Sequence, residues 1–431
     1  MTLACRQTAP QDVAQPAPAP TTTRQVEIRQ VAGEYRLYRL GKPYFIRGVA
    51  GTNQMETLAH YGGNSIRTYT TQHADSILDA AAQHGLSVML GIWVEPIRHG
   101  FDYDDSAAVA RQRERIRQEI LRYKDHPALL IWGIGNEVDL HHPSPSAWIA
   151  INEIARMVHE TDPDHPVAAS VLANRKSLEA FSTYCPDVDL LAINAFASMR
   201  RVVEELNTGS YAWQGPYIFS EWGDRGAWEA ETTHWGAPIE RNSTEKAEDF
   251  QANYSYAIQN NRARCLGGYA FFWGQKMERT HTWYSMCDDA GRKTPVVDML
   301  QFLWTGAKPA NQSPQLTALH LNGKTPFQKV YVHVGQPCEA ALTASDAEGD
   351  TLHYTWELLP EADNRHITGG DAEPRPAPIR EGFMSADQPT LRFNAPAKPG
   401  AYRLFVYVGD GRGSTAIANI PFFATYGSFG D

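Results

Sequence analysis

Eight short apolar runs recur between residues 44 and 274, and this repetition constrains the fold more than any other feature of the chain. Polar loops and amphipathic stretches separate the runs, and such alternation predicts parallel strands connected by helices. The runs are YFIRGVA, SIRTYT, LSVMLGIWV, ALLIWGIGN, PVAASVLA, VDLLAINAF, PYIFSEW and LGGYAFFWG. Helices are expected at 73–85, 106–126, 145–160, 243–261 and 294–304.

A (β/α)8 barrel accounts for this pattern, because it has eight parallel strands in about 250 residues. A doubly wound open sheet is the alternative, and it ordinarily carries a glycine-rich phosphate-binding turn after an early strand. The chain has no GxGxxG or GxxxxGK[ST] motif. We therefore predict an α/β fold, with a TIM barrel at residues 25–308 that begins with a hairpin-like stretch around 25–44.

A second domain is expected after the barrel. The segment AKPANQSPQL at 307–316 interrupts the rhythm with proline, asparagine and serine, which indicates a domain boundary. Beyond it, alternating strands and Asp-Gly turns predict a small all-β sandwich at 309–431. The proline-rich residues 1–24 are typical of a disordered tether.

Charge and motif content exclude several classes of function. The formal net charge is -10, which argues against a nucleic-acid partner, because such binding depends on basic patches. We expect a neutral or weakly charged substrate and no cofactor. His141 and His142 are adjacent in an expected loop, where no carboxylate spacing completes a metal site. No run approaches the roughly 20 apolar residues of a membrane span.

The five cysteines lack both CxxC pairing and zinc-ligand spacing, so they are expected as buried or free thiols. They are at positions 5, 185, 265, 287 and 338. The sequence TLAC at Cys5 resembles the end of a bacterial lipoprotein signal, although the apolar segment that should precede it is missing. This gives the hypothesis of a periplasmic or cell-surface protein, attached to a membrane through a lipid on Cys5.

Two of the predicted strands end in a glutamate. Glu137 follows the fourth run, and Glu221 lies near the end of the seventh. In a barrel the chemistry gathers where the strands end, and the fourth and seventh strands face one another across the mouth. Two opposed carboxylates, one protonated and one ionised, are what cleavage of a glycosidic bond requires. A cap at the end of each strand is the alternative role for these acids.

The residues around these acids resemble the catalytic barrel of glycoside hydrolase family 2 and, more broadly, of clan A. The resemblance runs over about residues 35–306 and rests on GGNSIRTY, GIGNE, FSEWG and YAFFWGQK. It implies a retaining mechanism, with Glu137 as acid/base and Glu221 as nucleophile. Where a family 2 barrel is preceded by sandwich domains, this sequence has only the hairpin-like stretch around 25–44, so we expect a barrel-only relative.

The resemblance also implies roles for neighbouring residues. Arg67 corresponds to an arginine that supports the nucleophile, Asn136 to an amide that contacts the sugar 2-hydroxyl, and Trp273 to an aromatic on which a sugar ring stacks. Structural roles are the alternative for each. Further substrate-binding candidates lie at or just beyond strand ends; they are Tyr69, Trp93, Asn194, Trp222, Gln275 and Trp283.

One position departs from the clan pattern. Many clan members have a tyrosine that hydrogen-bonds the nucleophile at the end of the sixth strand, where this chain has Phe196, two residues after Asn194. Tyr69 or another donor is expected to replace that hydroxyl, or else the nucleophile is tuned differently. The second outcome would favour transfer to a sugar acceptor instead of water.

Three functions follow from these observations. The leading one is a retaining β-glycoside hydrolase that cleaves a neutral oligo- or polysaccharide. A transglycosylase would use the same two carboxylates, and an inactive carbohydrate-binding barrel would need neither.

The second domain carries one further motif. Its segment DAEGDTLHYTW resembles immunoglobulin-like modules of the polycystic-kidney-disease and cadherin types. Asp346, Glu348 and Asp350 in this segment either bind calcium or close a hairpin turn. A packing or spacing role is expected for the module, with carbohydrate binding as the alternative.

Overall fold

The computed structural model describes residues 24–362, 370–380 and 383–427. Eight parallel strands close into a barrel, in the order β10-β11-β4-β5-β6-β7-β8-β9. Each strand coincides with one of the eight apolar runs, which confirms the predicted (β/α)8 fold. The strands are β4 (Ile46–Ala50), β5 (Ser65–Arg67), β6 (Ser87–Ile92), β7 (Leu129–Asn136), β8 (Val167–Leu172), β9 (Leu190–Asn194), β10 (Tyr217–Trp222) and β11 (Cys265–Ala270).

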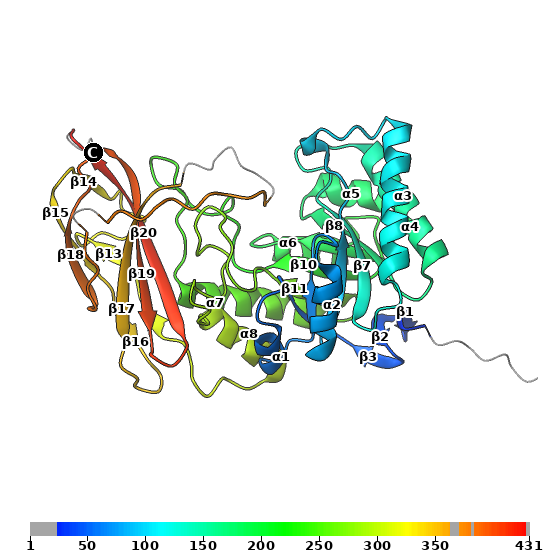
Figure 1. Ribbon diagram of the computed structural model, residues 1–431, viewed down its shortest axis with the longest axis horizontal. Coiled ribbons are helices and arrows are strands. Elements are labelled where there is room, and N and C mark those ends of the chain that lie inside the picture. The colour runs from blue at the N-terminus through cyan, green and yellow to red at the C-terminus, as the bar shows by residue number, and fades with distance from the viewer. Residues whose placement is uncertain (1–23, 363–369, 381–382, 428–431) are drawn as a thin grey trace, which may run out of the picture.

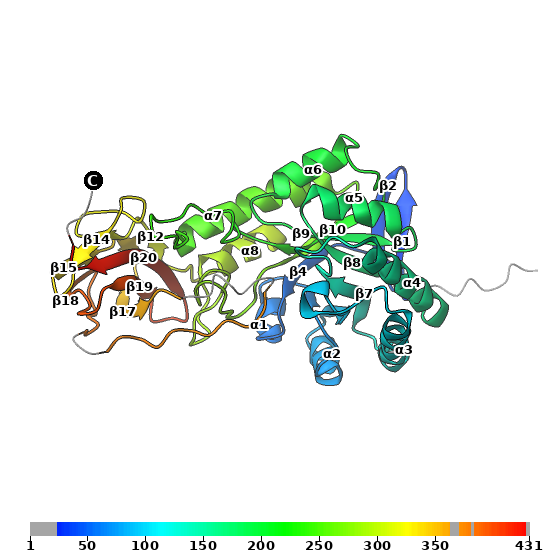
Figure 2. The ribbon, with the colours of Figure 1, turned by 90° about the horizontal axis from the view of Figure 1, so that it is seen from above.

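Helices surround the barrel (Figure 2). They are α1 (Met55–His60), α2 (Ala74–Gln83), α3 (Ser106–Tyr123), α4 (Pro145–Thr161), α5 (Arg175–Tyr184), α6 (Met199–Asn207), α7 (Ser243–Asn253) and α8 (Pro295–Thr305). Several begin at a side-chain cap, such as Asp105 before α3 and Asn242 before α7, which satisfies backbone N–H groups of the first turn. The predicted helix at 243–261 continues beyond α7 as a π-helical turn at Tyr254–Ile258 and a 3₁₀ turn at Gln259–Asn261.

A three-stranded sheet closes the end of the barrel opposite the strand C-termini. It consists of β1 (Val26–Val31), β2 (Glu34–Arg39) and β3 (Lys42–Tyr44), in agreement with the predicted hairpin-like stretch. Val26 and Leu37 share a buried cluster with barrel residues, among them Met89, Ile131 and Tyr269. The sheet therefore seals the barrel from one side and leaves the other side for the site.

The C-terminal part of the chain is a small all-β domain beside the barrel (Figure 1). Three-stranded (β13-β15-β18) and four-stranded (β14-β20-β19-β17) sheets share one apolar core, which includes Trp356 and Phe422. The strands are β12 (Gln315–Leu316), β13 (His320–Leu321), β14 (Tyr331–His333), β15 (Pro337–Ala341), β16 (Ala344–Ser345), β17 (His353–Pro360), β18 (Thr390–Asn394), β19 (Gly400–Gly409) and β20 (Thr415–Thr425).

The thiols agree with the expectation from the sequence. The four cysteines at 185, 265, 287 and 338 are buried and free, whereas Cys5 lies outside the described residues. Among the described residues, no helix combines the length and the apolar character that crossing a membrane requires.

Candidate active site

Irregularities in the barrel sheet place the two glutamates at its open end. The pairing of β7 with β8 shifts register between Ile134 and Asn136, and Gly135 there has a φ of 65°. Glu137 follows in the left-handed region with a φ of 50°, an uncommon conformation for a residue other than glycine and one found often at functional sites. The pairing of β10 with β9 shifts in the same way just before Glu221. Such bulges re-aim side chains, here toward the mouth of the barrel.

Arg67, the last residue of β5, connects the ends of four other strands. Its side chain is 2% exposed. The guanidinium donates to five acceptors, namely Oδ1 of Asn194 (3.3 Å), the carbonyl of Ser220 (2.8 Å), Oε1 of Glu221 (3.0 Å), Oδ1 of Asn136 (2.7 Å) and Oγ of Ser170 (3.0 Å). A fixed, permanently charged group therefore neutralises a carboxylate at position 221.

Tyr69 supplies the hydroxyl that Phe196 lacks. Its Oη donates to Oε1 of Glu221 at 2.9 Å, and Arg67 lies over its ring at 4.5 Å from the centroid. Burial, with the charge of Glu221, raises the pKa of Tyr69 well above its usual range, so the hydroxyl stays protonated as a donor. The structure thus answers the question that Phe196 raised, in favour of Tyr69 as the replacement donor.

Glu137 has a different environment. Its Oε1 accepts a hydrogen bond of 2.7 Å from Nδ2 of Asn194, an uncharged donor. Burial and the nearby charge of Glu221 raise the pKa of Glu137 to about 7. The pKa of Glu137 thus lies near pH 7, whereas Glu221 accepts hydrogen bonds from the guanidinium of Arg67 and the hydroxyl of Tyr69. This separation of two carboxyl groups is typical of an acid and a nucleophile that work as a pair.

Substitution of Tyr69 by phenylalanine tests the bond to Glu221. Loss of one hydrogen bond to a charged group corresponds to about 1.5–3 kcal/mol, so we expect kcat to fall about 10- to 100-fold. Melting followed by circular dichroism should show a folded protein. Tyr38→Phe, in the N-terminal sheet, is the control, and an unchanged kcat in Tyr69→Phe would contradict the assignment.

A third carboxylate stands close to the nucleophile candidate. Glu278, in the loop after β11, pairs with Nζ of Lys276 at 3.4 Å. Burial raises the pKa of Glu278, and the charge of Glu221 adds to that increase, whereas Lys276 opposes it. The loop after β11 therefore contributes an ion pair, Lys276 with Glu278, to the rim of the site. The sequence analysis did not predict this pair.

The all-β domain also reaches this rim. Residues 370–375, which we call the bridging segment, extend from that domain toward the barrel (Figure 1). Oδ1 of Asp371 lies 3.4 Å from Nη2 of Arg98, beyond β6, and the backbone N–H of Arg279, beyond β11, donates to Glu373 at 2.7 Å. The charge of Arg98 in turn acts on Glu137, whose pKa it lowers slightly. The second domain thus contacts two loops of the open face.

Three tryptophans predicted to bind substrate are in the wrong place for that role. Trp273 is fully buried and Trp222 is 1% exposed, both in the main apolar core. Trp283 is 2% exposed in a cluster with Phe196, and its Nε1 donates to the carbonyl of Arg225 at 3.0 Å. Each ring packs inward, so none offers a face to a sugar.

The remaining predicted residues lie in two groups. Arg67, Tyr69, Asn136 and Asn194 are linked by the hydrogen bonds that join the two glutamates. Trp93 and Gln275 are half-buried and have other partners: Trp93 stacks on His99 at 6.1 Å, and Gln275 donates to Asp289. The polar residues that sequence reasoning missed are Ser170, Ser220 and Glu278, because single serines and a loop glutamate carry no distinctive spacing.

The two groups considered for metal binding are the adjacent histidines and an acidic cluster of the all-β domain. His141 and His142 are exposed, as expected for a loop. In the described parts of the chain, the metal-type cluster found is Asp346, Glu348 and Asp350, whose ligand atoms lie within 4.8 Å of one another.

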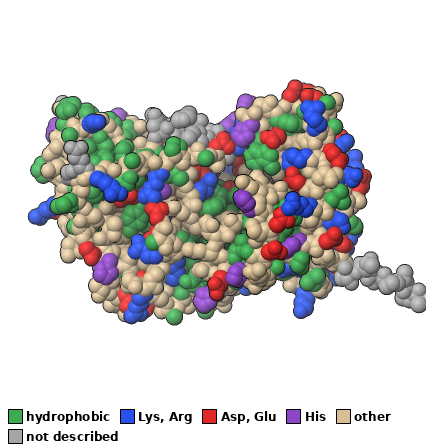
Figure 3. Space-filling view, viewed as in Figure 1, with side chains coloured by type: hydrophobic (Ala, Val, Ile, Leu, Met, Phe, Trp, Pro, Cys, Tyr) green, Lys and Arg blue, Asp and Glu red, His purple; other side chains and the backbone are tan. Residues whose placement is uncertain are grey.

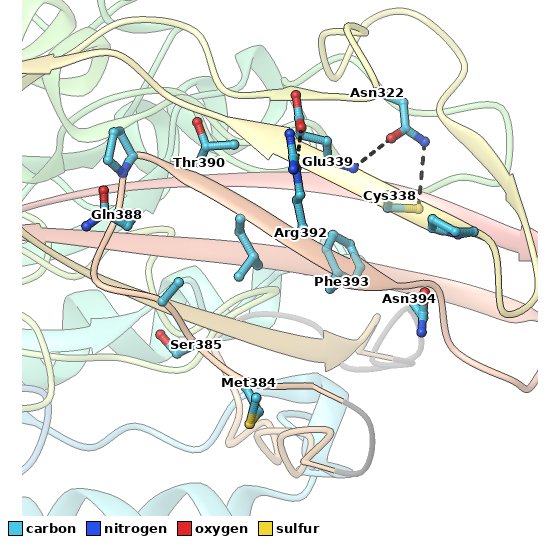
Figure 4. Close-up of a pocket in the computed structure, with 14 residues that line it drawn as sticks. Asn322, Cys338, Glu339, Met384, Ser385, Gln388, Thr390, Arg392, Phe393 and Asn394 are labelled. Atoms are coloured by element: carbon cyan, nitrogen blue, oxygen red, sulfur yellow. Dashed lines mark hydrogen bonds and ion pairs between the residues drawn. The ribbon is translucent and has the colours of Figure 1, made fainter.

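A hollow of about 1140 Å³ lies against β15 and β18 of the all-β domain (Figure 4). Arg392 and Glu339 face one another there, at 2.8 Å. None of the residues that line the hollow belongs to the glutamate network, so it is separate from the candidate active site.

The barrel brings paired glutamates to the ends of its fourth and seventh strands, the arrangement expected from the resemblance to clan A of the glycoside hydrolases. Residues 52–238 match the model of the TIM barrel domain of glycosyl hydrolases family 2. The barrel of this chain is therefore similar to the TIM barrel domain of that family.

Known proteins of this kind show similarity over part of their length. A β-glucuronidase of Chlorocebus aethiops is 22% identical over 234 residues, which cover 47% of this chain and 34% of that protein. The GH2 β-galacturonidase of Eisenbergiella tayi has a TM-score of 0.51 at 16% identity, covering 65% of this chain and 54% of the other. For the β-glucuronidase of Ruminococcus gnavus the TM-score is 0.51 at 14% identity, covering 66% and 53%. The chain thus spans about a third to a half of these relatives.

Proposed function

We propose that this protein hydrolyses β-glycosides with retention of configuration. The observation that carries the proposal is the difference between the two carboxyl groups. Glu137, with a pKa near 7, is suited to donate a proton, and Glu221, bound by Arg67 and Tyr69, is suited to act as an anion.

The reaction proceeds in two displacements. Glu221 attacks the anomeric carbon, while Glu137 gives its proton to the departing glycosidic oxygen, and a covalent glycosyl-enzyme forms. Glu137, now ionised, removes a proton from water, whose oxygen attacks the same carbon and releases Glu221. Asn194 orients Glu137 through its 2.7 Å bond. From the resemblance to clan A, we assign the contact with the sugar 2-hydroxyl to Asn136.

We propose a neutral sugar as the substrate. Two basic side chains at the barrel mouth are paired with acids. Arg98 faces the carboxylate of Asp371, and Lys276 faces that of Glu278. On the face shown in Figure 3, acidic and basic side chains are interspersed, without one broad positive area. This arrangement provides little excess positive charge for a uronic acid.

The similarity to enzymes named for glucuronides and galacturonides makes uronides the alternative substrate. A panel of 4-nitrophenyl β-glycosides of glucose, galactose, mannose and glucuronic acid decides between the two classes. Turnover of the glucuronide alone would contradict the neutral assignment, while leaving the mechanism intact. No turnover on this panel or on β-linked glycans would contradict the hydrolase and favour the binding barrel.

We propose hydrolysis in preference to transglycosylation. That alternative rested on a nucleophile without its hydroxyl donor, and Tyr69 donates at 2.9 Å. Analysis of products at high oligosaccharide concentration tests it directly, because longer products would appear only on transfer to sugar.

Substitution of Glu137 by glutamine should stabilise the protein at alkaline pH. The pKa of Glu137 is raised in the folded state, so its contribution to stability is complete below about pH 4.5 and is lost as the pH rises through about 7. Glutamine does not ionise and escapes this loss. We expect the Tm of Glu137→Gln to exceed that of the wild type by a few degrees at pH 8, with a small difference at pH 5. Equal Tm differences at both pH values in calorimetry would contradict the raised pKa.

A further inference from the structure

One aromatic side chain on the open face is exposed in a fixed loop. All eleven tryptophans lie in the described parts of the chain. The side chain of Trp228 is 67% exposed, and the other ten are buried or half-buried. It lies in the loop after β10, seven residues beyond Glu221. A large apolar ring left in water contributes little to folding, so its place at a candidate active site indicates contact with a ligand.

The loop holds Trp228 in a defined position. The carboxylate of Glu229 accepts hydrogen bonds from the backbone N–H groups of Ala197 (3.0 Å), Ser198 (3.2 Å) and Gly226 (2.8 Å). These bonds tie the loop to the start of α6. Several N–H donors on one carboxylate restrict the loop to one conformation, so the exposed ring is already ordered before any ligand binds.

Two contacts orient the ring itself. A Cβ atom at Gly226 would lie 2.5 Å from Cε2 and Cζ2 of Trp228, so the indole rests on a position that only glycine leaves open. The ring also meets Phe196 edge to face, with centroids 5.7 Å apart at 86°. The indole is thus supported by protein on one side, while most of its surface remains available.

The same aromatic cluster supports the nucleophile. Phe196 lies 5.4 Å from Tyr284, whose hydroxyl accepts a bond of 3.3 Å from the N–H of Ala227. Tyr69, the donor to Glu221, packs against this cluster. Trp228 therefore packs against the same aromatic cluster as Tyr69, which donates to Glu221.

We propose that Trp228 forms an additional subsite, on which a second sugar ring of an oligosaccharide stacks beside the ring that is cleaved. This inference rests on the proposed function and extends it to the substrate, which is then a glycan of at least two units. The C–H face of a pyranose is apolar, and aromatic rings bind such faces while the hydroxyls stay in water.

The test compares two substrates of the sugar that the panel selects: a β-linked trisaccharide and the 4-nitrophenyl monoglycoside. In Trp228→Ala the ratio of kcat/KM for the trisaccharide to that for the monoglycoside should fall about tenfold. Trp228→Tyr keeps an aromatic face and should restore most of the ratio. Gly226→Ala, which displaces the ring without removing it, should lower the ratio in the same direction.

Phe327→Ala is the matched control, because Phe327 is 63% exposed and lies on the all-β domain. Its ratio should equal that of the wild type. An unchanged ratio in Trp228→Ala would overturn the subsite. A change in molar mass of Trp228→Ala, measured by gel filtration with light scattering, would also overturn it, because the indole would then cover a contact between subunits.

A binding measurement separates this inference from the proposed hydrolysis. Calorimetric titration of Glu221→Gln with cellotriose, β-1,4-mannotriose and β-1,4-galactotriose requires no turnover. Binding of one of these that is lost on adding Trp228→Ala supports the subsite, even where the wild type cleaves nothing. Equal binding with and without Trp228 overturns the subsite and leaves the hydrolase intact.

Discussion

Substitution of Glu221 by glutamine should reduce kcat/KM on a 4-nitrophenyl β-glycoside by about 10⁴-fold or more, equivalent to about 5 kcal/mol of transition-state stabilisation. Glutamine fills the same space and still meets Arg67 and Tyr69, but it carries no negative charge and cannot attack the anomeric carbon. Steady-state kinetics measures the loss. The fold should persist, because Glu221 lies at the end of β10.

Chemical rescue distinguishes a lost nucleophile from a damaged site. Glu221→Gly leaves space beside the anomeric carbon, where azide can attack, so azide should restore turnover and yield a glycosyl azide of inverted configuration. Glu231→Gln, at an exposed carboxylate in the loop after β10, should retain full activity. Hydrolysis at the wild-type rate in Glu221→Gln would exclude this residue as the nucleophile.

Substitution of Glu137 by alanine should have an effect that depends on the leaving group. A poor leaving group such as a second sugar needs a proton, so kcat/KM should fall about 10³- to 10⁴-fold. A 2,4-dinitrophenolate departs without a proton, and kcat/KM for its glycoside should fall less than about tenfold. Stopped-flow measurement on the activated substrate should show a burst, because removal of the glycosyl group from Glu221 also needs Glu137.

The pH profile provides the second measurement on Glu137. Because this carboxyl donates a proton and has a pKa of about 7, the wild-type rate on the poor leaving group should fall as the pH rises above about 7. Alanine removes this alkaline limb, and Glu160→Gln, at an exposed position on α4, should preserve it. Equal losses on both leaving groups would mean that Glu137 is not the acid.

The barrel was predictable because parallel strands in such a fold are covered on both sides. Their sequences are therefore continuous apolar runs, such as LSVMLGIWV, bounded by polar loops. Both glutamates were predictable for a related reason, since a carboxylate directly after a buried run has to lie at a strand end. Tyr69 was expected as one replacement for the hydroxyl missing at Phe196, and its bond to Glu221 selects it from the alternatives.

The directions of the aromatic rings were not predictable. Trp222 and Trp273 lie at strand ends, as Glu137 and Glu221 do, yet both rings point into the core. The alternation of side chains along a strand is broken at the bulges where these strands end, so sequence position does not fix direction there. The exposed ring of Trp228 lies instead in a loop without periodic pattern, and its order depends on Gly226 and Glu229.

Contacts between residues far apart in the sequence were also not predictable. Asp371 meets Arg98 across 273 residues of sequence, and no local pattern encodes such a pair. Ser170 is likewise recognisable as a partner of Arg67 only once β5 and β8 are placed in one barrel.

The bridging segment connects the all-β domain to two loops at the open face of the barrel. Asp371 and Glu373 belong to the all-β domain by connectivity, yet they contact Arg98 and Arg279 in loops at the barrel mouth. An excised barrel would keep both glutamates and lose those contacts. On the proposed function, exchange of the C-terminal domain would change the groups at the barrel mouth and leave the two glutamates in place, so selectivity and bond cleavage would depend on different parts of the chain.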